Sequence, residues 1–474
     1  MDLLALELSD AGIMAAAKDP LGLLHIDGVD QESPGFALPG KDQLVVGRAA
    51  EGKAHLNPLQ FNNSFWDQLN TQPLKQPSDY ARNHAEMAYA HLARIWEKIR
   101  EHGNELVIAV PGFLSRDQLG LILGIADELS IPLKGMVALS VAAASKPCPD
   151  RMLLHIDIHL HRSEITFLEQ GEHLTQKDSV TGEGRGLNHL YTEWVKTIAE
   201  EFVRTTRFDP LHQAAFEQEL YSRLPVVIAA LQQNHSVMFE MGADSKNYRV
   251  SLSRDLFVKK GEAVFKEIHQ LIADMRERHG KPGQPVTFQL THRMSRLPGC
   301  REMLAGIAGA QVIELEPGCG AFGALDLWDH SSTQGTGRGV SLLTSRPWQR
   351  SEPLSTARPR PVQPISHSDI RPTHLLYRSV AYPLSDLPLT VGSGGIRDGI
   401  DVRMEGELAG VSKRHCSLQF QGDNVILTDH STSGTFVDEV RVTKTVVLKL
   451  GQIIRVGTPG EELQLIACVG RNET

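Results

Sequence analysis

Hydrophobic and polar positions follow two alternating periods over the first two-thirds of the chain. Residues 84–102 place their apolar side chains on one face of a helix. Leu106–Val110 is a short apolar run between turn signals, which predicts a buried strand. Ser115 and Gln118 then carry the signature of a helix N-terminus, followed by a second apolar stripe. This alternation of strands and helices over residues 1–328 predicts an α/β layered architecture.

The pattern changes twice beyond residue 328. Residues 329–372 have no sustained period and are rich in Ser, Gly, Pro and Arg, so they cannot bury enough apolar surface to offset their ordering entropy. We expect a flexible tether there; a partner-binding or phosphorylated segment is the alternative, and Val340–Leu343 with Trp348 offer apolar groups for local docking. Residues 373–474 carry short β-type runs between turns, which predicts an all-β sandwich. The predicted strands are Leu387–Val391, Ser417–Phe420, Asn424–Thr428, Thr435–Val437, Val446–Leu448, Ile453–Val456 and Leu463–Cys468.

Composition excludes several classes of protein. With 474 residues the chain should form more than one core, and its 41% hydrophobic and 22% charged content is that of a globular protein. A net charge of −9 without a dense Lys/Arg run gives no general reason to bind nucleic acid or an anionic membrane. The chain has no run of about 18 apolar residues, so membrane insertion is not expected. Its N-terminus lacks the basic region of a secretory signal. The five cysteines are scattered without a CxxC pair, which predicts reduced thiols and a cytoplasmic location.

Motifs in the last hundred residues resemble a known family. Ser412-Lys413-Arg414-His415 contains Ser-x-x-His, and Asp429–Thr435 contains Ser-Thr-x-Gly-Thr. With Leu450–Ile454 downstream, this spacing resembles the forkhead-associated (FHA) domain. The resemblance implies a β-sandwich whose loops at one end bind a protein partner bearing phosphothreonine, and it implies no chemistry.

The resemblance also assigns roles to residues of these loops. Ser412 is expected to donate a hydroxyl hydrogen bond to the phosphate, and Lys413 a charge-assisted one. His415 is expected to be a buried organiser of the loop and not a ligand. The peptide beside the phosphothreonine is expected to contact the next loop, at Thr432, Ser433 and the turn residue Gly434.

Two positions depart from the FHA pattern. The family's Gly-Arg is Gly392-Ser393 here, which removes a guanidinium that pairs bidentately with phosphate. Arg397 or Arg403, in the following loop, could reach the phosphate instead, whereas Asp438 would weaken anion binding if it faced the pocket. A sandwich that docks proteins without phosphate is therefore the alternative.

Weaker motifs, in a consistent order, make the first 328 residues resemble another family. They resemble the nucleotide-binding part of the DnaK-type heat-shock chaperones, within the actin and sugar-kinase superfamily. That resemblance implies a two-lobed α/β fold with ATP and magnesium between the lobes. A chaperone peptide-clamp region is missing, so a refolding chaperone is not expected. The matching segments are Leu4–Asp10, Val45–Ala50, Ala109–Pro111, Ala142–Ala144, Leu153–Thr166, Leu290–Gly299 and Gly320–Ala324.

The phosphate loops of this second family are rewritten in the chain. Such loops need glycines so that backbone N–H groups can approach the phosphates. The first loop reads Glu7–Asp10 without glycine, and the second keeps only its acid. Phosphoryl transfer depends on positioning and on metal-mediated charge neutralisation, so we expect no catalytic residue; ATP binding without turnover is left open, with Asp157 as a magnesium-water ligand. The residues of the predicted vestigial cleft are Glu7, Ser9, Asp157, His159, His292 and Arg293.

One further run suggests metal chemistry. On a strand, His155, Asp157, His159 and His161 would share one face, because alternate side chains point the same way. Three imidazoles and a carboxylate could bind zinc or another divalent ion. We favour the alternative, a polar edge of a loop where nucleotide no longer binds.

These inferences combine into one hypothesis. The chain is predicted to be a cytoplasmic scaffold or adaptor of a bacterial assembly, and not an enzyme. Its parts are an inactive DnaK/actin-like domain at residues 1–328, a tether at 329–372 and an FHA-like module at 373–474 that binds a protein partner. The alternative is an active ATP-dependent actin-like or chaperone-like machine that its FHA module targets.

Overall fold

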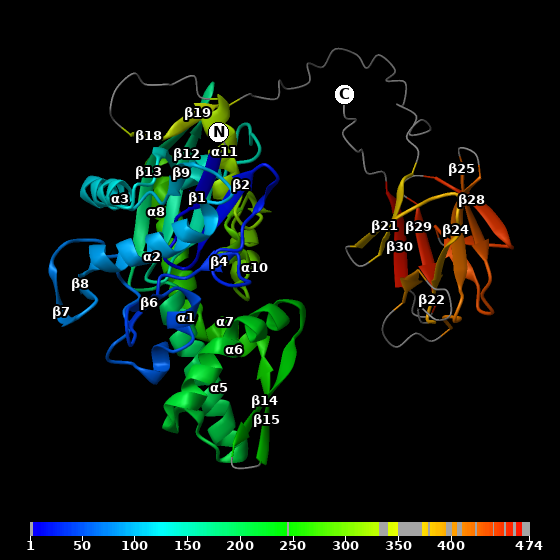
Figure 1. The fold of residues 1–474 in the computed structure, drawn as a ribbon, viewed down its shortest axis with the longest axis horizontal. Helices are drawn as coiled ribbons and strands as arrows, with labels where there is room; N and C mark the ends of the chain where they lie inside the picture. Colours follow the sequence, from blue (N-terminus) through cyan, green and yellow to red (C-terminus); the bar gives the residue numbers. More distant parts are fainter. Residues whose placement is uncertain are drawn as a thin grey trace. The chain divides into compact units, whose positions relative to one another are not determined.

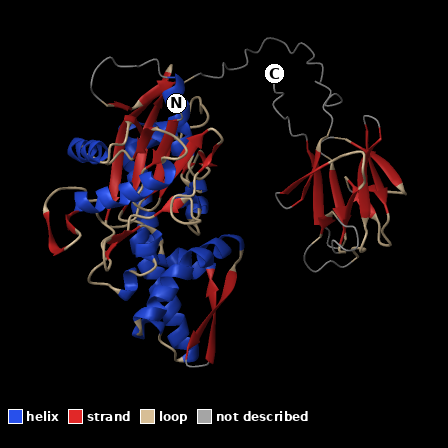
Figure 2. Ribbon diagram, in the orientation of Figure 1, coloured by secondary structure: helices blue, strands red, loops and turns tan. Residues whose placement is uncertain are grey.

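The chain divides into two compact units, Met1–Pro353 and Leu354–Thr474. Figures 1 and 2 show the first as a mixture of helices and strands and the second as strands. Among the described residues, no helix is long and apolar enough to cross a bilayer. The computed structural model describes residues 3–243, 246–330, 340–348, 372–377, 380–394, 401–404, 410–421, 424–438, 440–449, 452–457 and 461–466.

The first sheet of the N-terminal unit joins a three-stranded antiparallel meander to two parallel strands. Each parallel strand follows a helix, α2 (His84–Ile99) or α3 (Arg116–Glu128), whose apolar stripe packs into one core with the sheet. Ser115 caps α3 through a reciprocal capping box with Gln118, as the sequence predicts. In sheet order the strands are β10 (Leu133–Ala138), β9 (Glu105–Val110), β1 (Leu3–Glu7), β2 (Ile13–Lys18) and β3 (Leu21–Leu23), with β4 (Glu32–Ser33) also paired to β2.

The second sheet repeats the strand order of the first. Its meander again comes first in the chain, and two parallel strands again extend the edge of the first meander strand. The N-terminal unit is therefore built from two halves of one topology, a duplication that the sequence analysis did not detect. In sheet order the strands are β17 (Ala310–Glu314), β16 (Val286–Leu290), β11 (Met152–Ile158), β12 (Arg162–Gln170) and β13 (His173–Glu183).

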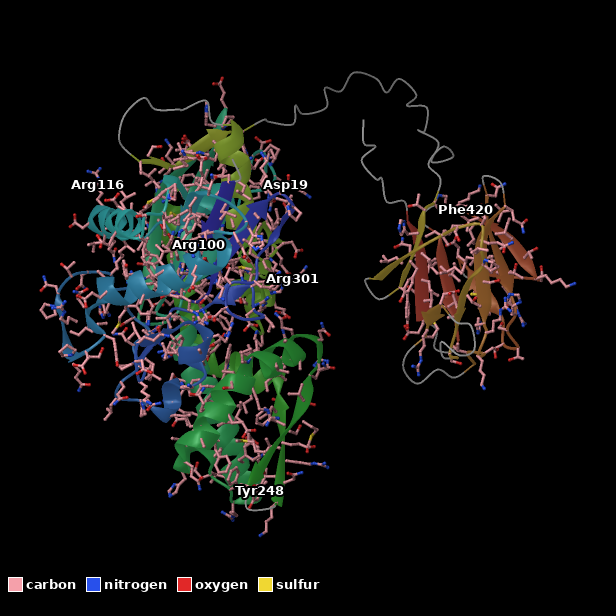
Figure 3. All side chains as sticks on the ribbon, viewed as in Figure 1. Asp19, Arg100, Arg116, Tyr248, Arg301 and Phe420 are labelled. Atoms are coloured by element: carbon pink, nitrogen blue, oxygen red, sulfur yellow. The ribbon has the colours of Figure 1, made fainter. Side chains whose placement is uncertain are left out.

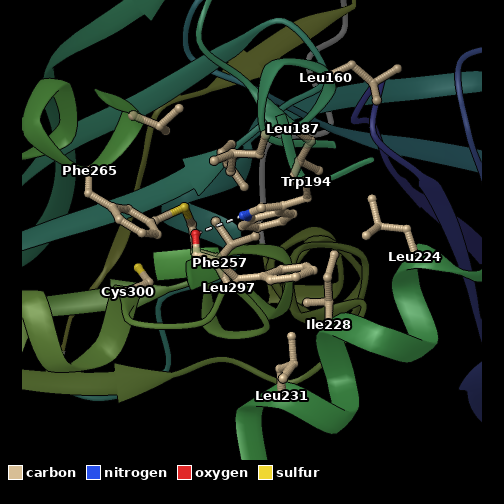
Figure 4. Packing of buried hydrophobic residues seen from close by; sticks show 14 of the residues in the cluster. Leu160, Leu187, Trp194, Leu224, Ile228, Leu231, Phe257, Phe265, Leu297 and Cys300 are labelled. Atoms are coloured by element: carbon tan, nitrogen blue, oxygen red, sulfur yellow. Dashed lines mark hydrogen bonds between the residues drawn. The ribbon is translucent and has the colours of Figure 1, made fainter. Parts of the chain in front are cut away.

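A large apolar core lies between the second sheet and its helices (Figure 4). Trp194 is fully buried there and stacks on Phe257, with ring centroids 5.6 Å apart. Its indole Nε1 donates a hydrogen bond of 2.9 Å to the Phe257 carbonyl, so the largest side chain of the core leaves no buried donor unpaired. The helices of this half are α5 (Leu187–Thr206), α6 (Ala214–Gln233), α7 (Arg254–Lys260), α8 (Glu262–His279), α9 (His292–Ser295) and α10 (Cys300–Ala305).

Smaller elements complete the N-terminal unit. The hairpin of β14 (Ser236–Ala243) and β15 (Lys246–Ser253), which carries Tyr248, lies beside α5 and α6 (Figures 1 and 3). The Tyr248 ring stacks on the Phe208 ring, with centroids 4.6 Å apart. The remaining elements are β5 (Ala37–Pro39), β6 (Leu44–Val46), α1 (Arg48–Glu51), a 3-10 turn at Ala54–Leu56, β7 (Pro73–Ser78), β8 (Ala81–Asn83) and a 3-10 turn at Pro210–His212.

Small residues bring the two halves together. Helix α4 (Leu139–Ala142) packs against α11 (Cys319–His330) in a core rich in alanine. The contact is so close that a Cβ on Gly323 would lie 1.8 Å from the Ala142 carbonyl oxygen. Any larger residue at position 323 would push the backbones apart, which explains the glycine.

A short segment after α11 adds a strand to each sheet. β18 (Ser341–Leu343) pairs parallel with β10, and β19 (Ser345–Pro347) pairs antiparallel with β13. Trp348 then buries its side chain in the core between the halves, and its backbone N–H donates to the Glu172 carbonyl at 2.8 Å. Residues 340–348, which the sequence analysis assigned to a flexible tether, therefore belong to the N-terminal unit; we call them the strap. Residues 329–330 of the predicted tether are the end of α11, and residues 331–339 and 349–371 lie outside the described residues.

The C-terminal unit is a sandwich of two sheets around one apolar core. The described strands include the seven predicted runs, with bounds that differ by up to two residues, and four short strands that the pattern missed. One sheet is β21 (Val380–Pro383), β20 (His374–Tyr377), β30 (Glu461–Ile466), β29 (Ile453–Val456), β26 (Thr435–Val437) and β27 (Val440–Arg441); the other is β23 (Val402–Arg403), β22 (Leu389–Gly392), β24 (Cys416–Gln421), β25 (Asn424–Asp429) and β28 (Thr445–Leu448).

The strap generates a stability prediction. Trp348→Ala should lower the free energy of unfolding of the N-terminal unit by about 3–5 kcal/mol, because it empties a site in the core between the halves. Leu342→Ala is the matched control: Leu342 is 42% exposed, so its loss should cost less than about 1 kcal/mol. Urea denaturation of the full chain measures both values. Equal midpoints for the two variants would show that the strap is not a structural part of the unit.

Candidate functional site

One buried guanidinium connects the two halves of the N-terminal unit. Glu7 ends β1 in the first sheet, Asp157 lies in β11 of the second, and Arg293 lies in α9, directly after β16. Arg293 Nη2 donates to Glu7 Oε1 at 3.0 Å and to Asp157 Oδ2 at 2.9 Å. Arg293 Nε donates to Asp157 Oδ1 at 3.2 Å. Three of the predicted cleft residues thus form a single ion-pair network.

The two carboxylates of this network are almost fully satisfied by protein groups. Glu7 Oε2 accepts from the Gly320 N–H at 2.9 Å, and Asp157 Oδ1 accepts from Thr291 Oγ1 at 2.6 Å. Burial opposes charge on Asp157, but the attraction of Arg293 is stronger and holds the pKa of Asp157 far below its usual value. The same carboxylates raise the pKa of Arg293 despite its burial. The network is therefore charged, and Arg293 Nη1 is buried in it without a hydrogen-bond partner among the described residues.

A second cluster joins the two hairpins that carry Ser9 and His159. His159 Nδ1 lies 3.1 Å from Ser9 Oγ, and His159 Nε2 lies 3.3 Å from Glu164 Oε2. Asp10 Oδ1 accepts from the Leu160 N–H at 2.8 Å, which ties the first hairpin to the backbone of the second. Burial alone would lower the pKa of His159, but the surrounding carboxylates raise it, which favours the imidazolium. Side chains thus occupy the space between the hairpins.

The sixth predicted residue, His292, lies next to Arg293 but points elsewhere. Its Nε2 is 2.5 Å from Oε1 of Glu32 in β4, a contact that again joins the two halves. Burial acts against the Glu32 charge, but His292 lowers the pKa of that carboxyl to about 2. Sequence reasoning missed Glu32, Glu164 and Thr291. Only Glu164 carried a signal, since it lies opposite Asp157 in the β11–β12 register.

The histidine-rich run does not build a metal site in the described structure. β11 ends at Ile158, and His161 Nε2 turns to the Asn63 carbonyl at 2.9 Å. His155 is buried, and neither ring nitrogen has a hydrogen-bond partner among the described residues. Within the described ranges, no three His, Cys, Asp or Glu side chains gather closely enough to hold a metal ion.

In the C-terminal unit, His415 joins the two loops that the sequence singled out. The ring is fully buried; Nδ1 accepts from the Ser412 N–H at 3.2 Å, and Nε2 lies 3.3 Å from the Gly434 carbonyl, to which it donates. Burial lowers the pKa of His415, so the neutral ring keeps one donor and one acceptor. His415 is positioned as an organiser of the loops, with no nitrogen left for a ligand.

The second loop is a tight turn held by acceptors at both ends. Asp429 Oδ1 accepts from the Ser431 N–H at 3.0 Å and from Thr435 Oγ1 at 2.8 Å. Ser431 Oγ accepts from the Gly434 N–H at 2.8 Å, and Gly434 has φ of 99°, a value that favours glycine. The turn therefore projects Thr432 and Ser433 into solvent.

The predicted phosphate-binding groups meet at this turn. Ser412 Oγ accepts from the Thr432 N–H at 3.3 Å and lies 3.4 Å from Thr432 Oγ1. Lys413 and Arg414 follow on the same loop, and both are exposed. Neither forms an ion pair among the described residues. The structure thus brings together Ser412, Lys413, Thr432, Ser433 and Gly434.

The departures from the FHA pattern also have places in the structure. A Cβ on Gly392 would lie 2.0 Å from the Lys413 carbonyl oxygen, so glycine is needed where β22 passes this loop. Ser393 Oγ donates to the Val411 carbonyl at 3.3 Å, a contact that stabilises the start of the loop that carries Ser412. Arg403 lies opposite Gly392 in register and is exposed, whereas Arg397 lies outside the described residues. Asp438 does not serve the loops: its carboxylate accepts from the Ile453 N–H and from Gln452 Nε2.

The Arg293 network generates a second stability prediction. Arg293→Met should destabilise the N-terminal unit by about 3–5 kcal/mol, because it leaves two buried carboxylates without a counter-charge. Adding Glu7→Gln and Asp157→Asn should recover part of that loss. Arg296→Met, at an arginine whose side chain is 54% exposed, is the control and should change little. Denaturant titration of the full chain measures the free energy of unfolding of the unchanged protein and of each variant. Equal losses for Arg293→Met and Arg296→Met would contradict the prediction.

Comparison with known proteins assigns one of the two units. No curated protein matches the chain. Residues 389–457 match the family model of the FHA domain, a span that runs from β22 to the end of β29 and contains both organised loops. The C-terminal unit of this protein is therefore an FHA domain.

Proposed function

We propose that this protein is a non-catalytic adaptor that binds a threonine-phosphorylated protein through its FHA domain. The observation that carries the proposal is the contact between Ser412 and Thr432 on two loops that the buried His415 holds together, with the exposed Lys413 next to Ser412 in the chain. Hydroxyl and ammonium donors on an organised loop suit a phosphate dianion, since charge-assisted hydrogen bonds are the strong ones.

The electrostatics of the loops support an anionic ligand. Lys413, Arg414 and Arg403 are exposed, and none of them forms an ion pair within the part of the chain that the structure describes. Asp429, inside the second loop, accepts from the Ser431 N–H and Thr435 Oγ1, and Asp438 directs its carboxylate to the start of β29. Gly392-Ser393 supplies no guanidinium, so Lys413 and Arg414 would carry the charge that the family's arginine supplies. We therefore favour phosphate-dependent docking over docking that ignores phosphate.

For the N-terminal unit we propose a two-lobed DnaK/actin-like fold that has lost its ATPase activity. The repeated strand order of the two sheets supports the fold, because such a fold is built from two similar lobes. The predicted first and second phosphate loops correspond to the β1–β2 and β11–β12 hairpins, which occupy equivalent positions in the two halves. The matching segment Leu290–Gly299 contains α9, which carries Arg293.

The residues of this cleft do not fit magnesium and ATP. Glu7 and Asp157, the two acids that could have held a metal through water, bind Arg293 instead. A guanidinium supplies a positive charge at the point where a metal would otherwise be needed. Between the hairpins, Ser9 and His159 are in contact, so no open backbone cradle faces a phosphate. In this proposal, Arg293 and His159 link the two halves in the place that ATP and magnesium would otherwise occupy.

Phosphopeptide binding tests the first part of the proposal. A degenerate phosphothreonine peptide library should yield binders of the full chain, and Ser412→Ala or Lys413→Ala should weaken them about tenfold, since each removes a charge-assisted hydrogen bond. Lys449→Ala is the matched control, because Lys449 is exposed and precedes β29, at the end of the sandwich remote from the turn. Fluorescence anisotropy measures the affinities. Equal binding of phosphorylated and unphosphorylated peptides would refute the phosphate role.

Calorimetry tests the second part. Titration of the full chain with ATP and magnesium should give no saturable heat at millimolar nucleotide, and phosphate release should equal that of buffer, because Arg293 satisfies both acids. Tight binding with turnover would instead favour the ATP-driven machine.

A further inference from the structure

A cavity of about 180 Å³ lies where the first half of the N-terminal unit faces α5 and α6. One wall comes from α1 and the 3-10 turn that follows it, with Arg48, Glu51 and His55. The opposite wall includes Tyr191 of α5 and Tyr221 of α6. None of the six residues of the predicted vestigial cleft lines it, although the structure describes them all. We call it the aromatic cavity.

Contacts between the two halves fix the walls of the aromatic cavity. Gln218 of α6 is buried; its Oε1 accepts from the His55 N–H at 2.9 Å, and its Nε2 donates to the Glu51 carbonyl at 3.1 Å. The His55 ring stacks on the Tyr221 ring, with centroids 3.5 Å apart and planes 7° apart. Burial lowers the pKa of His55 to about 4, so the stacked ring is neutral at pH 7. The walls are therefore preformed, and aromatic rings make part of them.

Two polar groups of α5 line the aromatic cavity without a partner. The Tyr191 hydroxyl and the Asn188 side-chain amide form no hydrogen bond within the part of the chain that the structure describes. They lie three positions apart on one helix, a spacing that places them on the same face. Burial raises the pKa of Tyr191, so its hydroxyl keeps the proton and can donate. Together these groups offer hydrogen-bond donors and acceptors to a ligand.

The size and charge of the aromatic cavity limit what it can hold. An apolar cavity of about 150 Å³ holds benzene, whereas pockets for drug-sized ligands measure roughly 300–1,000 Å³. At about 180 Å³, the aromatic cavity therefore fits one six-membered ring with a small substituent. The two charged residues of its wall pair with each other, because Arg48 Nη1 contacts Glu51 Oε2. The walls thus favour a neutral ligand, and a triphosphate is too large and too highly charged.

We infer that the aromatic cavity binds a small neutral molecule built from one aromatic ring with an amide-like edge. The ring would lie among the His55, Tyr191 and Tyr221 rings, and its edge would pair with the Tyr191 hydroxyl and the Asn188 amide. The inference concerns the N-terminal unit and does not depend on the ligand of the FHA domain. Because both halves contribute walls, the bound molecule would stabilise the arrangement in which the halves meet.

Benzamide serves as the probe, since it combines one aromatic ring with one amide. Saturation-transfer difference NMR on the full chain should give a Kd of about 1 mM or lower, the range of a well-fitted ligand of this size. Tyr191→Phe should weaken benzamide binding about three- to tenfold, because it removes one hydrogen-bonding group and keeps the ring. Tyr89→Phe is the matched control: Tyr89 lies in α2 and is 39% exposed, so this variant should bind as the unchanged protein does.

A second variant fills the site. Ser222 also lines the aromatic cavity, where its Oγ accepts from Gln218 Nε2 at 3.2 Å. Ser222→Leu places an aliphatic side chain in this space and should abolish benzamide binding. A urea midpoint close to that of the unchanged protein shows that the variant folds. Tyr191→Phe tests the inference even where Ser222→Leu fails to fold.

Three outcomes would overturn the inference. One is the absence of saturation transfer to benzamide at about 10 mM, well above the expected Kd. Another is full affinity for benzamide in Tyr191→Phe or in a folded Ser222→Leu. The third concerns adenosine, whose base and ribose together are too large for the aromatic cavity and should not displace benzamide. Displacement by adenosine would assign the cavity to a nucleoside instead.

Discussion

The N-terminal unit depends on a single positive charge that two halves share. Glu7 comes from the first sheet and Asp157 from the second, and the Arg293 guanidinium neutralises both in the interior. If the halves separated, Glu7 would lose its counter-charge, because Arg293 belongs to the second half together with Asp157. Because that charge belongs to the chain itself, both carboxylates stay ionised in the interior.

Local patterns predicted the elements whose causes are local. Helix α3 was predicted because its capping box involves residues three positions apart, and β9 because its apolar run is unbroken. The duplication was missed because it lies in strand order, which no single stretch of residues encodes. Arg293 was predicted to lie in a vestigial cleft but not to form an ion pair, since its partner Glu7 is 286 positions away. The strap was missed because its strands have three residues each and gain their stability from the edges of distant sheets.

The FHA domain shows the same division on a smaller scale. The resemblance to the FHA domain implied that His415 is an organiser, and its partner Ser412 is three residues away. Asp438 could be weighed only conditionally, and the structure shows its carboxylate bound at the start of β29. The Arg441 guanidinium lies against Gly434, a contact that the motif could not show, because only the short hairpin of β26 and β27 returns it there. Which charged side chains lie near these loops thus depends on strand register as much as on distance along the sequence.

The strap also determines how the two units can act on each other mechanically. The strap precedes the FHA domain in the chain; its two strands pair with both sheets of the N-terminal unit, and Trp348 is buried between the halves. A pull on the FHA domain by a bound partner would travel along the chain and load Trp348 and β19 before any other element. Tension would first separate the edge strand β19 from β13 of the second sheet, and the buried Arg293 network would stay intact. The strap would therefore detach before the Arg293 network opens, and the N-terminal unit could bear a pulling force without separation of its halves.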